Sequence, residues 1–150
     1  MRRVKLSTKG RYGLRAMIDL AMHCDNEAVS ISSIAQRQSL SESYLEQLMS
    51  KLMKAGLVKS VRGAQGGYLP AKELDKISVG DILRALEGDL RPVNCPGIVE
   101  MGQCSGADSC VTKYVWQRIN DSLNETVDNI FLSTLVEESK KCGGAQGCAL

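Results

Sequence analysis

The stretch SESYLEQLMSKLMKAGLVKSVRGAQGGYLP, residues 41–70, decides the fold of this chain. Its first half predicts a helix, for which Ser41 is a natural N-cap and the Ala-Gly pair at 55–56 a natural end. Apolar residues at helical spacing predict one buried face on this helix: Leu45, Leu48, Met49 and Leu52.

The second half of the stretch predicts a β-hairpin. Leu57, Val58 and Val61 are strand formers, and glycines at 63, 66 and 67 suit a turn that needs positive φ. Pro70 ends the pairing because it lacks a backbone N–H. Arg62 stands beside the hairpin tip.

Two more helices precede this stretch. Residues 7–24 have helical periodicity with Ser7 or Thr8 as the cap, and residues 30–40 form a shorter pattern capped by Ser30 or Ser32. The break at 38–41 has the length of a helix-turn-helix corner. The sequence therefore predicts a mainly α fold in which residues 1–72 form a winged helix-turn-helix DNA-binding domain.

The charge distribution agrees with a nucleic-acid partner. Residues 1–72 hold twelve Lys and Arg against five Asp and Glu, whereas residues 73–150 hold seven against twelve. A basic half favours a polyanion, although charge alone is equally compatible with a solvated surface. In a winged helix, the N-terminal part of the third helix reads base edges and the wing reaches a groove. The candidate base-reading residues are Ser41, Ser43, Tyr44, Glu46, Gln47 and Arg62, and the candidate phosphate-binding residues are Lys9, Arg11 and Tyr12.

The second half of the chain divides into four parts. Residues 73–90 predict a linker helix in which Ser78 and Asp81 have capping-box spacing. Residues 91–110 form a cysteine-rich loop, residues 111–141 a long helix and a short terminal helix capped by Ser133, and residues 142–150 a glycine-rich tail. The apolar stripe from Val111 to Ile130 is too long and one-sided for so small a body, and it predicts a homodimer.

Six cysteines occur in the chain, three of them in the loop at Cys95, Cys104 and Cys110. The N-terminus lacks a signal-peptide core and no apolar run has membrane-span length, so we expect a cytoplasmic protein, no membrane partner and reduced thiols. The C-x8-C-x5-C spacing lacks the C-x2-C pairs of most zinc sites and suits an iron–sulfur cluster. A redox thiol switch and a loop with incidental cysteines remain open. No catalytic constellation appears, and we expect no enzyme activity.

Three segments carry a family resemblance: STKGRYGLRAMIDLA at 7–21, residues 41–68 and VGDILRALEG at 79–88. They resemble the IscR/NsrR/CymR family of winged-helix regulators, also called the Rrf family, over residues 3–137. The resemblance implies a homodimer that binds an operator in double-stranded DNA and an iron–sulfur cluster, more often 2Fe–2S than 4Fe–4S, in the cysteine loop. By position, Cys95, Cys104 and Cys110 match the thiolate ligands, and Ser43, Glu46 and Arg62 match base-reading positions.

The chain departs from the cluster-binding members at one position. They place a histidine three residues after the third cysteine, where this chain has Lys113. The one histidine, His23, is expected to be structural, and candidates for the fourth ligand are Glu100, Asp108, a tail cysteine or a small molecule. The implied function is a repressor of the cluster-biogenesis or cysteine-metabolism type, controlled by its cluster. The alternative is a CymR-like repressor controlled by a partner enzyme of cysteine or cluster assembly, or by a thiol switch.

Overall fold

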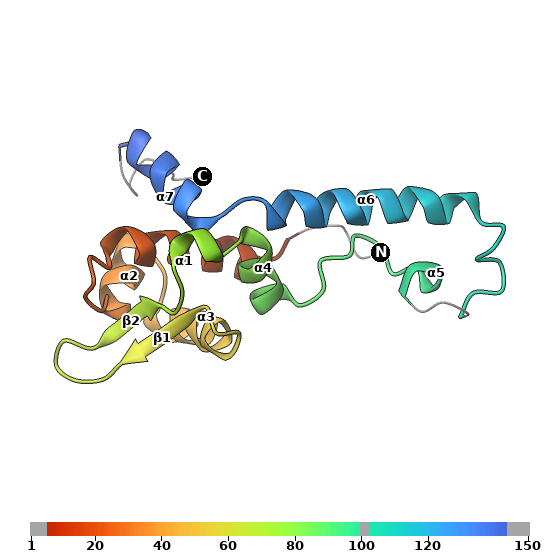
Figure 1. Cartoon of the computed structure of the whole chain (residues 1–150). Helices are drawn as coiled ribbons and strands as arrows, with labels where there is room; N and C mark the ends of the chain where they lie inside the picture. Colours follow the sequence, from red (N-terminus) through yellow and green to blue (C-terminus); the bar gives the residue numbers. More distant parts are fainter. Residues whose placement is uncertain (1–5, 100–102, 144–150) are drawn as a thin grey trace.

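The computed structural model describes residues 6–99 and 103–143, and it contains a winged helix-turn-helix body from which one long helix projects (Figure 1). The elements in chain order are α1 (Thr8–His23), α2 (Ile31–Gln38), α3 (Glu42–Lys54), β1 (Val58–Val61), β2 (Gly67–Pro70), a 3₁₀ turn η1 (Leu74–Lys76), α4 (Val79–Glu87), α5 (Pro96–Val99), α6 (Val111–Asp128) and α7 (Leu132–Lys141). No described helix is long and apolar enough to cross a membrane.

Local caps start the first three helices where the sequence predicts. The hydroxyls of Ser7, Ser30 and Ser41 accept hydrogen bonds from backbone N–H groups of α1, α2 and α3. Ser39 adopts a left-handed conformation with φ of 55° and makes the corner between α2 and α3. The predicted stripe of α3 lies fully inside the core: Leu45, Leu48, Met49 and Leu52. The helix-turn-helix interpretation is confirmed.

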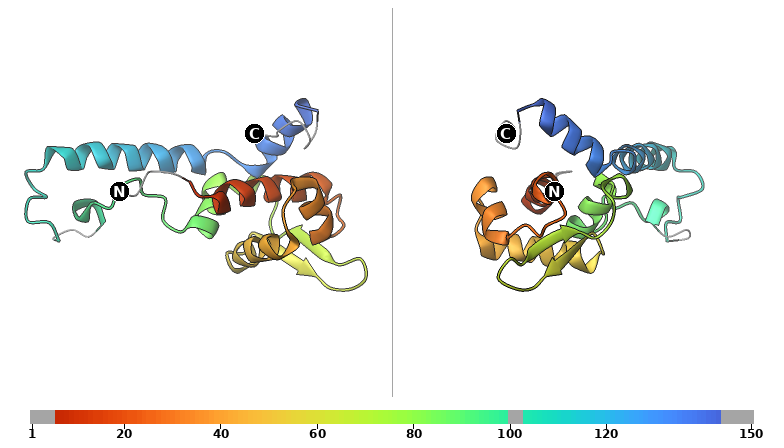
Figure 2. Two further views of the ribbon diagram at one scale, coloured as in Figure 1. Left: turned by 180° about the vertical axis from the view of Figure 1, so that it is seen from behind. Right: turned by 60° about the vertical axis from the view of Figure 1, so that its left-hand side comes forward.

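The wing is an antiparallel hairpin with Val58 opposite Pro70 and Val61 opposite Gly67. Strand β2 is also held by a third segment, because the backbones of Val29 and Tyr68 exchange two hydrogen bonds of 2.9 Å each. Gly67 is needed there, since a Cβ atom at this position would lie 2.1 Å from the carbonyl oxygen of Val29. The hairpin and α3 lie on the opposite side of the body from α7 (Figure 2).

A buried carboxylate joins α1 to the end of α2. The side chain of Asp19 is fully buried and accepts hydrogen bonds from Arg37 Nη2 at 2.6 Å and Gln38 Nε2 at 2.8 Å. Arg15 donates in turn to Gln38 Oε1 at 3.1 Å. A buried charge is stable only when its partners are complete, so this network fixes α2 immediately before the corner.

The terminal helix corrects one sequence expectation. It begins at Leu132 with Phe131 at the N-cap position, so the predicted cap Ser133 already lies inside the helix. The reason is tertiary: the backbone N–H of Leu132 donates to the carbonyl of Ile77 at 2.8 Å, and Val79 N–H donates to Ile130 O at 2.8 Å. These bonds to the start of α4 satisfy the backbone in place of a hydroxyl. The helical turns η1 and α5 were also not predicted.

We predict that Asp19→Ala lowers the free energy of unfolding by about 3 kcal/mol, because it leaves the Arg37 and Gln38 side chains without their buried acceptor. Urea denaturation at pH 7 measures the loss. The control is Asp25→Ala in the exposed turn after α1, which should change stability by less than about 0.5 kcal/mol. Equal effects of the two substitutions would contradict the role given to Asp19.

Candidate nucleic-acid interface and thiol loop

The outward face of α3 is polar at its N-terminal end. Burial of the apolar stripe turns the opposite face to solvent, and these candidate base-reading residues are exposed on it: Ser41, Ser43, Glu46 and Gln47. Ser41 also caps the helix, its hydroxyl accepting from Tyr44 N–H at 3.2 Å. The predicted residues at the start of α3, except Tyr44, are thus open to solvent, as contacts to base edges in a groove require.

Tyr44 lies differently from the other candidates. Its ring packs edge-on against Tyr12 of α1, with 6.3 Å between ring centroids. Its buried hydroxyl has no hydrogen-bond partner within the described part of the chain. Arg15 lies over the Tyr12 ring at 5.5 Å. The two tyrosines therefore join α3 to α1, whatever contact they make with DNA. The sequence analysis did not predict that Arg15 would contact Tyr12. Its spacing of three residues from Tyr12 on one helix face indicates such a contact.

Three further basic candidates are exposed on the winged helix-turn-helix body. Lys9 and Arg11 lie in the first turn of α1, and Arg62 follows β1 at the wing tip, next to Gly63 with φ of 117°. Long, solvated cations of this kind suit phosphate contacts and narrow grooves. The roles of these residues stay predictions.

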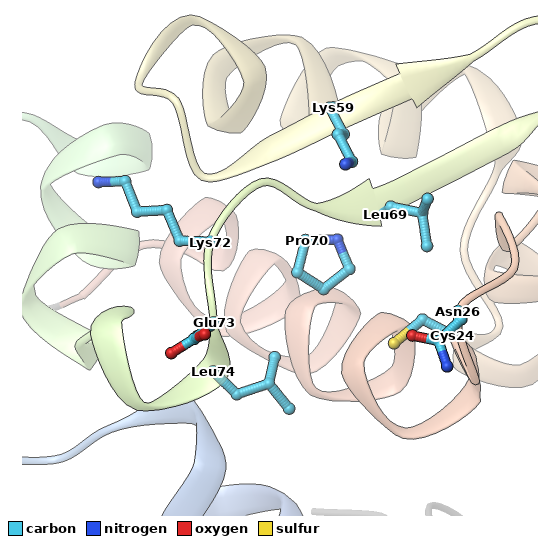
Figure 3. Close-up of a pocket in the computed structure, with 8 residues that line it drawn as sticks. All are labelled: Cys24, Asn26, Lys59, Leu69, Pro70, Lys72, Glu73 and Leu74. Carbon is cyan, nitrogen blue, oxygen red and sulfur yellow. The ribbon is translucent and has the colours of Figure 1, made fainter.

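A cleft of about 300 Å³ lies where the hairpin meets the end of α1 (Figure 3). Its lining combines one thiol, two amines, one carboxylate and apolar side chains: Cys24, Asn26, Lys59, Leu69, Pro70, Lys72, Glu73 and Leu74. The Cys24 thiol donates to Ala21 O at 3.5 Å. The sequence did not indicate this cleft, because its walls come from separate segments brought together by the hairpin.

The cysteine loop folds back on itself at the N-terminal end of α6, which is the end away from the body (Figure 1). Gly97 lies so close to the start of α6 that a Cβ atom there would meet Lys113 Cδ at 3.3 Å and Ala107 Cβ at 3.6 Å. Cys95 and Cys104 are half-buried, Cys110 is exposed, and all three thiols are free of disulfide bonds. The short helix α5 is thus held near the start of α6.

Cys110 stands at the N-cap position of α6, with its sulfur 3.1 Å from the Thr112 hydroxyl. The hydrogen bond with Thr112, and a second from the backbone N–H of Lys113, hold the pKa of this thiol below its usual value. The thiolate, which is the form that binds metals, is therefore favoured at this position.

Three free thiols share one short loop, and thiolates are the ligands that iron–sulfur clusters prefer. The chemistry of these residues therefore fits such a cluster. Within residues 6–99 and 103–143, however, no three Cys, His, Asp or Glu side chains stand close enough to hold a metal ion. Asp108 is exposed, Lys113 is half-buried, and Glu100 lies outside the described residues. His23 contacts the Asp19 carbonyl at 2.8 Å on α1, in agreement with a structural role.

Comparison with known proteins decides the family. Residues 6–138 match the model of the Rrf2 family, described as iron-dependent transcriptional regulator. The chain belongs to the Rrf2 family. It is 40% identical over 137 residues to the HTH-type transcriptional regulator IscR of Cronobacter sakazakii, a match that covers 91% of this chain and 83% of the relative.

Solved structures of two Rrf2-type regulators have the same fold. CymR, the global cysteine regulator of B. subtilis, superposes with a TM-score of 0.75 at 46% identity, covering 89% of this chain and 97% of CymR. IscR of T. potens gives 0.72 at 48% identity, covering 91% and 89%. This Rrf2 protein is therefore an IscR-like, DNA-binding transcriptional regulator with a winged helix-turn-helix, and it is not an enzyme.

We predict that Glu46→Ala changes which operator sequences are bound, because a carboxylate on α3 selects among base edges. Lys9→Ala should instead weaken binding to every sequence and reduce the salt slope by about one unit, as the loss of one phosphate contact would. Fluorescence anisotropy on duplexes selected from a random library, at several salt concentrations, measures both effects.

The control for Glu46 is Glu137→Ala, which removes the same charge from the exposed face of α7 on the opposite side of the body. It should leave sequence preference unchanged. Uniform loss over all duplexes with both Glu46→Ala and Lys9→Ala would contradict the division of roles.

Proposed function

We propose that this Rrf2 protein is a homodimeric repressor whose affinity for DNA is controlled by an iron–sulfur cluster, of the 2Fe–2S type, bound by Cys95, Cys104 and Cys110. The observation that carries the proposal is the position of the thiols: three free cysteines share one folded-back loop that leads directly into the projecting helix α6. The similarity to IscR supports it.

The ligands come from both ends and the middle of the loop. Cys95 precedes α5, Cys104 lies in the turn after it, and Cys110 begins α6. A bound cluster would respond to oxidants and to iron supply, because both change its redox state or its integrity. Binding these three thiolates draws the loop together and fixes the start of α6 relative to the segment that leaves α4.

The fourth coordination position has no assigned protein ligand. Lys113 stands at the position of the family's histidine, and an ammonium group cannot coordinate iron until it loses its proton. Asp108 is exposed in the same loop and supplies a carboxylate within the chain. A cluster held by three thiolates and one weaker ligand is easier to lose, as a sensor requires.

The exposed face of α6 supports dimerisation. Val111, Tyr114, Val115 and Ile119 are exposed to between 44% and 80%, and they follow one helix face. Among the residues that the structure describes, the C-terminal part of α6 packs on the body, through Leu123 and Val127. A second copy of α6 would bury the apolar stripe and would set two copies of α3 at the spacing of two half-sites.

The cluster prediction is tested by anaerobic purification. We expect an absorption band at around 400 nm or above from thiolate-bound iron, and its loss in the Cys95/Cys104/Cys110→Ser protein. On the same promoters, the reconstituted wild type and the triple variant should differ by roughly 5- to 150-fold in affinity. Cys24→Ser, which removes a thiol outside the loop, is the control and should keep the band. Equal binding of every promoter by the wild type and the triple variant would exclude cluster control.

The dimer prediction uses two substitutions that add the same charge to α6. Ile119→Glu places a carboxylate on the exposed apolar face and should shift the particle mass, measured by light scattering, from twice 16.3 kDa toward 16.3 kDa. Gln117→Glu, on the opposite face of the helix, should leave the dimer intact. A wild-type monomer at micromolar concentration would refute the assignment.

A second candidate function is favoured by the similarity to CymR, the global cysteine regulator. In this alternative, a partner enzyme of cysteine or cluster assembly controls DNA binding, or the loop thiols act as a redox switch without a cluster. Anaerobic protein would then lack the visible band, and the promoters bound would respond to the partner enzyme or to a thiol oxidant.

A further inference from the structure

The start of α1 is capped by a residue that lies far away in the sequence. The Glu87 carboxylate oxygen Oε1, at the end of α4, accepts hydrogen bonds from Ser7 N–H at 2.9 Å, Ser7 Oγ at 2.5 Å and Gly10 N–H at 2.9 Å. These donors belong to the first turn of α1, whose N–H groups have no partner within the helix. One oxygen atom of α4 therefore fixes the conformation of this turn.

The same turn has the wrong charge for a helix N-terminus. It contains no acidic residue, and it presents the exposed cations Lys9 and Arg11. Cations near the N-terminal end of the helix dipole are unfavourable, whereas an anion is favourable there. Glu87 supplies the missing anion from another helix, so the turn keeps its cations for a polyanion partner.

Tight packing makes α1 and α4 a single unit. A Cβ atom on Gly10 would lie 2.6 Å from Glu87 Oε1, and one on Gly13 would lie 2.1 Å from Leu86 Cδ1. On another side of α4, Arg84 donates to Asp128 at 2.7 Å and to Asn124 at 2.6 Å. The α4 helix is thus joined to the first turn of α1 and to α6, and the chain leaving Glu87 runs to Cys95.

We propose that Glu87 is a positioning residue for DNA binding, which holds the first turn of α1 so that Lys9 and Arg11 contact the phosphate backbone. The proposal rests on the DNA-binding role of the chain and on the predicted phosphate contacts, and it does not require a cluster. Because Glu87 ends the helix that precedes the cysteine loop, it is also the residue of α4 that a movement of the loop reaches first.

Two substitutions separate hydrogen bonding from charge. Glu87→Gln keeps an acceptor oxygen and removes the charge, whereas Glu87→Ala removes both. We expect Glu87→Ala to weaken binding to library-selected duplexes roughly fivefold or more, with a salt slope shallower by about one to two units. Glu87→Gln should keep the wild-type slope and bind at least as tightly, since it removes a negative charge near DNA.

The measurements are made at a temperature where circular dichroism shows every variant folded, and in the Cys95/Cys104/Cys110→Ser background as well as in the wild type. The effect of Glu87→Ala should be the same in both, so that failure of cluster control does not affect the result. The effect should also be much smaller in a Lys9→Ala protein, because coupled residues are not additive.

Three results would overturn the proposal. Equal or tighter binding by both Glu87 variants would mean that Glu87 acts only as a repulsive charge. Weaker binding by Glu87→Ala with an unchanged salt slope would mean that Glu87 contributes to stability alone. A salt slope that does not respond to Lys9→Ala itself would remove the phosphate contact on which the proposal rests.

Discussion

The close approach of α4 to α1 is the constraint on which the arrangement of this molecule depends. Two glycines of α1, Gly10 and Gly13, leave room for Glu87 and Leu86, and a methyl group at either position would force one of these side chains to move. Helices in such contact cannot slide independently. One short helix, α4, therefore packs against both the DNA-binding body and the projecting α6, and it is buried along Val79, Ile82, Leu83 and Leu86.

Local signals in the sequence predicted most of the fold. The caps at Ser7, Ser30 and Ser41 and the capping box of Ser78 and Asp81 need only neighbouring residues, and each forms as expected. Contacts between distant segments were not predictable in the same way. Glu87 caps a turn eighty positions before it, and Ile77 replaces a hydroxyl at the start of α7. No periodicity or propensity carries information about such partners.

The candidate sites also differ in how far local sequence signals predict them. The polar face of α3 was predictable, because burying Leu45 and Leu48 on one side exposes Glu46 and Gln47 on the other. The tyrosine pair was not, since the position of Tyr44 depends on the packing of α1. For the thiol loop, the sequence predicts which sulfur atoms are free, but not their arrangement. The arrangement of side chains in an irregular loop depends on distant contacts, which no periodic pattern encodes.

The backbone bonds between Val29 and Tyr68 divide the wing into a fixed base and a replaceable tip. The strands are tied to the body through this bridge, and Gly67, directly beside it, has no substitute. Beyond it, residues 62–66 contribute nothing to the buried core, and only Gly63 and Gly66 are restricted by backbone geometry. Lengthening such a tip costs only loop entropy, about 0.6 kcal/mol for each doubling. The tip is thus a modular part, whose length and sequence can diverge, or be redesigned, without refolding the helices beneath it.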